Sequence, residues 1–181
     1  MDEVARGGMG ERSLFVLDAA SPVGIPTALA MPGPYFVCLL AWDARGVSAV
    51  DVGAVAERLL RAGCAYAVCW GPDCERVHDI FDEVELELRP DGPWAMTTWH
   101  TDEPLAEAIW FALFSAWPDE AFADGCRSVI GVSVGSPGWA AEVRAAFMAP
   151  GEFSAAWLAG GDSPDAEPLS WPTDLNQNEN P

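Results

Sequence analysis

The chain contains four segments of strand length, and each is followed after a turn by a segment with helical periodicity. The strand-like segments are 35–42, 65–70, 95–100 and 128–134. The first reads YFVCLLAW, a continuous apolar run typical of a strand buried on both faces. Helices are expected at 51–62, 73–87, 102–117 and 136–147, with Asp51 and Asp102 as N-terminal caps.

This alternation predicts right-handed crossovers in a mainly parallel sheet of four to five strands. We therefore expect an α/β fold of the three-layer Rossmann-like or flavodoxin-like type, with helices on both faces of the sheet. One domain is expected at 34–160. Residues 1–33 contain several prolines and glycines, so they are predicted to form an irregular N-terminal arm in which SLFVLDAA is a candidate short strand. Residues 161–181 are polar and acidic, which predicts a disordered tail.

The net charge of −19 comes from 28 acidic residues against nine basic ones, and all nine bases are arginine. Binding of nucleic acid or of an anionic membrane is not expected, because both need clustered positive charge. The helix expected at 73–87 carries seven acids. Its outward-facing acids are Glu75, Asp79, Asp82 and Glu83. They form either a solvated surface or a docking face for a basic protein partner.

The N-terminal residues are polar and charged, without the apolar stretch of a signal peptide, and no apolar run reaches the length of a membrane helix. The five cysteines are irregularly spaced, which argues against a disulfide framework, and Cys38 and Cys69 lie within apolar strands. A cytoplasmic location is the expectation from these features.

A ligand in such a sheet binds beyond the carboxyl ends of the strands, so the strand ends define the candidate site. His100 is a candidate general base there, with Asp102 or Asp43 to orient its ring; the alternative is that it braces a helix start. The candidate ligand-binding residues at the same edge are Trp70, Gly71, Trp99 and Ser136. Ser136 is equally explained as a cap before Pro137.

Metal and cofactor sites are not predicted. Cys69, Cys74 and His78 have ligand chemistry, but their C-x4-C-x3-H spacing is not that of a zinc site. The turn VGSPGW at 134–139 lacks the glycine pattern of a dinucleotide fold, and a P-loop requires a lysine that this chain does not contain.

The stretches CWGPDCERVHDIFDE (69–83) and MTTWHTDEPLAEAIWF (96–111) resemble a family of small bacterial domains of unknown function with W-G-P-D-C-x-x-x-H-D and T-T-W-H blocks. The resemblance covers roughly residues 35–147. It implies that Trp70, His78, Asp79, Trp99 and His100 act together, and it implies no activity.

The function expected from these features is a non-enzymatic acidic module that binds another protein. An immunity or accessory protein of a bacterial defence or signalling system fits this charge and size. The alternative is a small hydrolase, a nucleotide-processing enzyme or a ligand sensor that uses His100 at the sheet edge. The sequence leaves the oligomeric state open.

Overall fold

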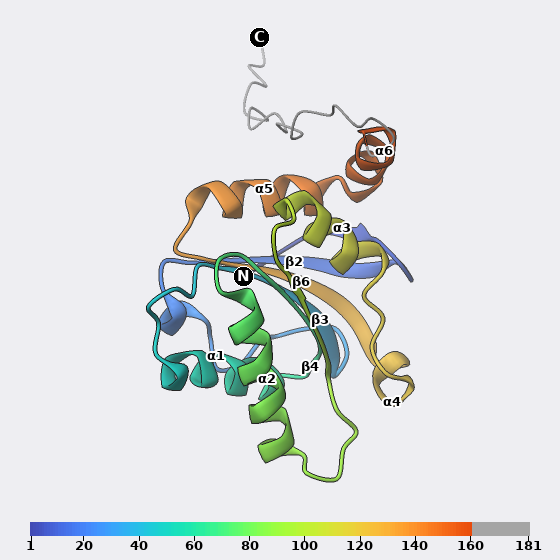
Figure 1. Cartoon of the computed structure of the whole chain (residues 1–181). Helices are drawn as coiled ribbons and strands as arrows, with labels where there is room; N and C mark the ends of the chain where they lie inside the picture. Colours follow the sequence, from blue (N-terminus) through green and yellow to red (C-terminus); the bar gives the residue numbers. More distant parts are fainter. Residues whose placement is uncertain (161–181) are drawn as a thin grey trace.

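A six-stranded mixed sheet forms the centre of the computed structural model, which describes residues 1–160 (Figure 1). The strands are β1 (Asp2–Gly7), β2 (Arg12–Ala19), β3 (Tyr35–Trp42), β4 (Cys64–Trp70), β5 (Met96–His100) and β6 (Cys126–Val134). Their order across the sheet is β1-β2-β6-β3-β4-β5. Only β1 is antiparallel to its neighbour; the other pairs are parallel.

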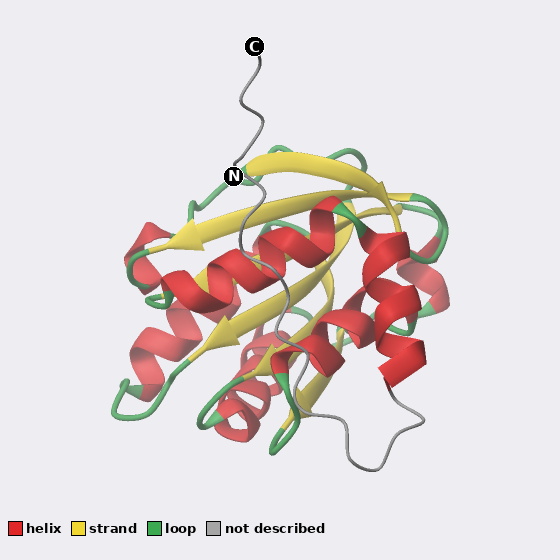
Figure 2. Ribbon diagram, turned by 90° about the horizontal axis from the view of Figure 1, so that it is seen from above, coloured by secondary structure: helices red, strands yellow, loops and turns green. Residues whose placement is uncertain are grey.

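The helices cover both faces of this sheet. They are η1 (Pro22–Gly24, a 3-10 turn), α1 (Ala49–Arg61), α2 (Cys74–Leu88), α3 (Leu105–Phe114), α4 (Glu120–Ala123), α5 (Pro137–Met148) and α6 (Pro150–Gly160). Helices α1 and α2 lie on one face, and α3 and α5 lie on the other (Figures 1 and 2). The α/β class expected from the alternation of segments is confirmed.

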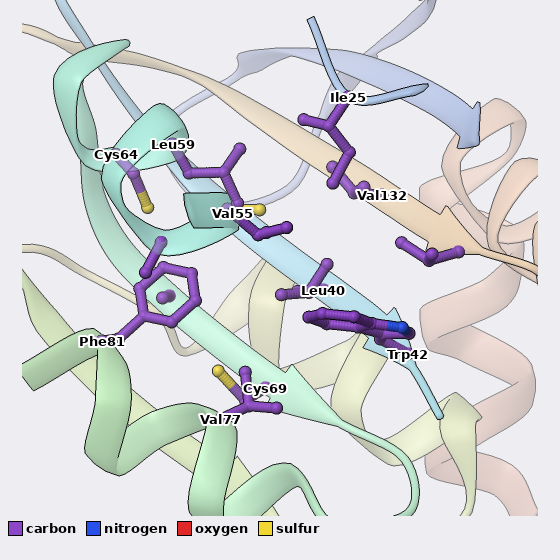
Figure 3. Close-up of a cluster of buried hydrophobic side chains, with 14 of the residues drawn as sticks. Ile25, Leu40, Trp42, Val55, Leu59, Cys64, Cys69, Val77, Phe81 and Val132 are labelled. Carbon is purple, nitrogen blue, oxygen red and sulfur yellow. The ribbon is translucent and has the colours of Figure 1, made fainter. Parts of the chain in front are cut away.

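Strand β3 contributes to the hydrophobic core on both faces of the sheet. Its residues Phe36, Leu40 and Trp42 pack toward α1 and α2 (Figure 3), and the intervening Val37 and Leu39 pack toward α3 and α5. Successive side chains of a strand point to opposite faces, so an apolar residue is needed at every position. The prediction of a strand buried on both sides is confirmed for this segment.

The first half of the predicted irregular arm at residues 1–33 contains β1 and β2, so the sheet has more strands than the four to five expected; the candidate strand SLFVLDAA is confirmed as β2. β2 lies between β1 and β6, and pairs with β6 in parallel from Ser13 to Ala19. Leu14 and Val16 enter one core cluster, while Phe15 and Leu17 enter the other. The apolar stretch SLFVL therefore forms a strand because it lies in the interior of the sheet, where both of its faces are buried.

Two expected helix caps are also wrong. Ser48, not Asp51, caps α1: its hydroxyl accepts the Asp51 N–H at 3.1 Å and donates to the Asp51 carboxylate at 2.7 Å. The Ser48 hydroxyl thus satisfies one backbone donor of the first helical turn and is itself held in place by the Asp51 carboxylate. Asp102 adopts a left-handed backbone conformation with φ of 63°, and α3 begins at Leu105 after Pro104.

All five cysteines are free and buried. Hydrogen bonding with the Cys64 thiol, together with burial, raises the pKa of Cys38, and burial raises the pKa of Cys69. Cys64 and Cys69 lie beside Phe81 and Val77 in the cluster under α2 (Figure 3). These thiols act as small apolar side chains of the core.

No helix within residues 1–160 combines the length and the apolar character needed to cross a membrane. The tail predicted to be disordered, residues 161–181, lies outside the described part of the chain.

Candidate functional site

The carboxyl ends of β4 and β5 form a switch point in the sheet. β4 leads into α2 on one face, whereas the neighbouring β5 leads into α3 on the other face. The two connecting loops therefore separate and leave space between them, which is where open α/β sheets bind ligands.

A cavity of about 540 Å³ occupies this switch point. Its walls are the end of β4, the β4–α2 loop, the end of β5, the β5–α3 loop and the first turn of α5. The lining residues are Trp70, Gly71, Pro72, Asp73, Cys74, Glu75, His100, Thr101, Asp102, Glu103 and Trp139. Four of the predicted site residues (Trp70, Gly71, His100 and Asp102) and one predicted partner-binding residue (Glu75) thus share one cavity.

Two tryptophans form the apolar wall of the cavity. The rings of Trp70 and Trp139 meet edge to face, with centroids 5.1 Å apart and planes at 85°. The Trp70 indole N–H donates to the Glu103 carbonyl at 2.8 Å, which fixes the ring orientation. Because one indole edge faces the other ring, the pair is a preferred aromatic geometry that resists rearrangement.

His100 sits beside Trp70 on the next strand, and its side chain is only 8% exposed. Its Nδ1 lies 2.7 Å from a Glu103 carboxylate oxygen, and its Nε2 lies 3.3 Å from the Thr98 hydroxyl. The ring also packs against Phe111, with centroids 4.9 Å apart. The partner that orients the ring is therefore Glu103, rather than the expected Asp102 or Asp43, and both ring nitrogens are engaged within the protein.

The carboxylates of the cavity fall into two kinds. Asp73 is paired with the Arg76 guanidinium at 2.7 Å, and Glu103 contacts His100. Glu75 and Asp102 are exposed, and neither carboxylate has a hydrogen bond or ion pair to any residue of 1–160. No arginine lines the cavity, so its net charge is negative.

Gly71 has a backbone role at the cavity floor. Its φ is 112°, which is strained for other residues, and a Cβ atom there would lie 2.5 Å from the Trp42 carbonyl oxygen. The glycine therefore allows the β4–α2 loop to pass close to the end of β3.

Three predicted site residues do not line the cavity. Asp43 forms an ion pair with Arg45 at 2.7 Å, and this hydrogen bonding lowers the pKa of Asp43. Trp99 is 46% exposed and packs on His78, because strand alternation turns it away from the face that His100 occupies. The Ser136 hydroxyl accepts the Trp139 N–H at 3.4 Å and caps α5. The cap explains Ser136 without a ligand.

The remaining predicted partner-binding acids lie farther along α2. Asp82 accepts a hydrogen bond from the Thr97 hydroxyl at 2.6 Å, and Asp79 contacts the His78 ring at 3.1 Å. Glu83 is exposed. Of the four predicted partner-binding acids, Glu75 is therefore the one that lines the cavity.

Sequence reasoning missed Glu103 and Trp139. Glu103 lies three residues after His100 in the same loop, and this short separation was an available signal. Trp139 is 39 positions away from His100 and reaches the cavity only because α5 starts beside the end of β4. Within residues 1–160, no group of three or more histidine, cysteine or acidic side chains is placed to hold a metal ion.

His100→Ala is expected to lower the free energy of unfolding by about 2 kcal/mol, because it leaves a buried gap and removes the partner of Glu103. Urea denaturation followed by circular dichroism measures this. Thr101→Ala, at the exposed next position, is the matched control and should change stability by less than about 0.5 kcal/mol. Equal stability of His100→Ala and wild type would show that the ring does not brace the loop.

A protein-family model described as a domain of unknown function (DUF7684) matches residues 15–150. This range includes most of β2, all elements from β3 through α5 and every residue of the cavity. The resemblance to a domain family of unknown function is thus confirmed. No curated protein matches the chain.

Proposed function

We propose that this chain, which belongs to the DUF7684 family, works by binding another protein that presents a basic surface. The observation that carries the proposal is the cavity at the ends of β4 and β5, which is lined by four acidic residues and by no arginine. An immunity or accessory role in a bacterial defence or signalling system is the biological setting that we propose for such a module.

The charge of the whole molecule supports this choice of partner. A net charge of −19 creates a negative potential that speeds encounter with a basic protein and repels anionic ones. Exposed charges at the edge of an interface act mainly on the rate of association, while partly desolvated charges at its centre act on the lifetime of the complex. Glu75 and Asp102 lie at the cavity, where a docking surface would cover them.

At the level of the fold, we propose that β2 to β6 with their helices are a Rossmann-like three-layer unit. The crossovers on both faces and the cavity at a switch point support this assignment. The strand order departs from the flavodoxin pattern, because β6 lies between β2 and β3.

The alternative of a hydrolase or nucleotide-processing enzyme with His100 as general base has less support. A general base must reach the proton that it removes inside the site where the substrate binds. Nδ1 of His100 is held by Glu103 at 2.7 Å, and Nε2 faces the Thr98 hydroxyl at 3.3 Å, which does not line the cavity; the ring itself is buried. Negative charge around the cavity also disfavours the phosphates of a nucleotide.

The test is purification of the tagged full chain from cells of its own source at about 50 mM salt, where screening is weak. Each captured protein is then purified, and its dissociation constant for the chain is measured by calorimetry at low and high salt. We expect a stoichiometric complex with a basic protein that weakens as salt rises. Absence of any such complex between purified proteins at low salt overturns the proposal.

Charge-reversal variants locate the contact. Glu75→Lys combined with Asp102→Asn should weaken the complex by at least about tenfold, because one attractive charge becomes repulsive and a second is removed without straining the left-handed backbone of residue 102. Glu87→Lys combined with Glu152→Gln makes the same change in net charge at exposed positions away from the cavity. It should weaken the complex far less; equal weakening by both pairs would mean that only total charge matters.

A further inference from the structure

We propose that the cavity receives an arginine side chain of the partner, with its guanidinium held between the tryptophan pair and the unpaired carboxylates. This inference rests on the proposed function and deepens it, because it names the chemical group that enters the cavity.

The carboxylates provide the first argument. Glu75 comes from the first turn of α2 and Asp102 from the β5–α3 loop, and neither carboxylate has a partner within residues 1–160. A guanidinium carries five N–H donors in a planar fork, so one group can donate to acceptors in two different loops. A compact ammonium has fewer donors and is more strongly hydrated, which makes it a weaker match.

The tryptophans provide the second argument. Trp70 and Trp139 present indole surfaces at the same cavity, and their mutual orientation is set by the hydrogen bond from Trp70 to the Glu103 carbonyl. Indole faces attract cations, and guanidinium groups stack on them more often than ammonium groups do. Carboxylates and indoles that line one cavity therefore favour a ligand with a planar cationic group at the end of an apolar chain.

One guanidinium of the chain itself is bound beside the cavity, and it accounts for the Asp73 carboxylate. Arg76 donates to the Asp73 carboxylate at 2.7 Å and to the carbonyls of Ala44 and Val47 at 2.8 and 3.2 Å. These contacts hold Arg76 toward the β3–α1 connection, and it does not line the cavity. Asp73 is thus neutralised internally, which leaves Glu75 and Asp102 for an incoming group.

The N-terminus of α2 is the main competing influence, because the start of a helix attracts anions. Here the first turn of the helix carries Glu75, and Asp102 lines the same cavity. These two unpaired carboxylates outweigh the partial positive charge of the helix end, so the local field still favours a cation.

The test uses small probes and the full chain in the absence of any protein partner. Nα-acetyl-arginine methylamide is titrated while the indole N–H signals of Trp70 and Trp139, assigned with Trp70→Phe and Trp139→Phe, are followed by NMR. We expect saturable shifts of these two signals with a dissociation constant on the order of millimolar, as befits a single solvent-accessible side chain.

Matched probes test the chemistry. The citrulline analogue has nearly the same shape without the charge, and it should give no saturable shift. The lysine analogue should bind at least about threefold more weakly, because it lacks the planar fork. Binding of the lysine probe as tight as that of the arginine probe would overturn the choice of arginine.

Matched variants test the place. Asp102→Asn keeps the left-handed backbone, which asparagine tolerates, and Glu75→Gln is nearly isosteric. Each variant should raise the dissociation constant of the arginine probe about fivefold, whereas Glu87→Gln should leave it unchanged. If the probe fails to bind while the protein complex of the preceding section forms, this inference is wrong and the proposed function stands. If the probe binds but no protein complex forms, the cavity binds guanidinium groups as inferred and the proposed function is wrong.

Discussion

Replacing Arg12 with alanine is expected to lower the free energy of unfolding by about 3 kcal/mol. Arg12 is only 2% exposed, and its guanidinium donates to the carbonyls of Ala112, Leu113 and Ala116 at 3.2 to 3.4 Å. These carbonyls lie at or just after the end of α3, where no following turn of the helix supplies an N–H donor for them. Removal of Arg12 leaves them without their charged donor and opens a gap below Trp117, over which the guanidinium stacks.

Two further variants separate the causes. Arg12→Met retains most of the side-chain volume but none of the donors, so a loss close to that of alanine would assign the effect to the hydrogen bonds. Arg127→Ala removes an exposed arginine whose guanidinium donates to the Asp124 carbonyl, and it should cost less than about 0.5 kcal/mol. Urea denaturation gives all three values, and equal losses for Arg12→Ala and Arg127→Ala would contradict the prediction.

Phe81→Ala is expected to lower the free energy of unfolding by about 3 to 5 kcal/mol. Phe81 is fully buried between α2 and the sheet, beside Cys64, Cys69 and Val77 (Figure 3). Truncation removes a large apolar side chain and leaves a cavity that the surrounding strands cannot fill. Because α2 also carries Glu75, the same change is expected to weaken binding at the cavity in the fraction that stays folded.

The matched control lies on the same helix. Leu86 is 55% exposed, so Leu86→Ala makes a similar chemical deletion without a buried cavity. Its expected cost is below about 1 kcal/mol. Thermal and urea denaturation of the two variants provide the comparison, and similar losses from both would mean that α2 is not anchored through Phe81.

Much of the candidate site was predictable because it lies at strand ends. Trp70, Gly71, His100 and Asp102 follow directly from two segments with clear strand character, and parallel strands end at the same edge. Trp99 was misplaced because its side chain points to the opposite face from His100. The period of two along a strand predicts this difference, provided that the strand is given a buried and an exposed face.

The helix caps show where local reasoning stops. Asp51 and Asp102 both have the right residue type for a cap, and in each case a different residue begins the helix. Ser48 precedes Asp51 by three positions, so its hydroxyl can accept the Asp51 N–H, whereas the Asp51 carboxylate accepts from the Ser48 hydroxyl and caps no backbone group. Pro104 sets the start of α3, because proline fits the first positions of a helix and constrains the residue before it.

By itself, the sequence determined the alternation of strands and helices, the double burial of β3, the excess of negative charge and the position of His100 at a strand end. The first two and the last of these features depend on residues close together in the chain, and the side-chain periods of helices and strands convert such patterns into structure. The excess of negative charge depends on composition alone. The tertiary structure alone decided that β2 is an interior strand, that Glu103 orients His100, and that Trp139 completes the cavity with Trp70. These contacts depend on the order of strands in the sheet, which is set by how all the apolar faces are buried together and not by any single segment.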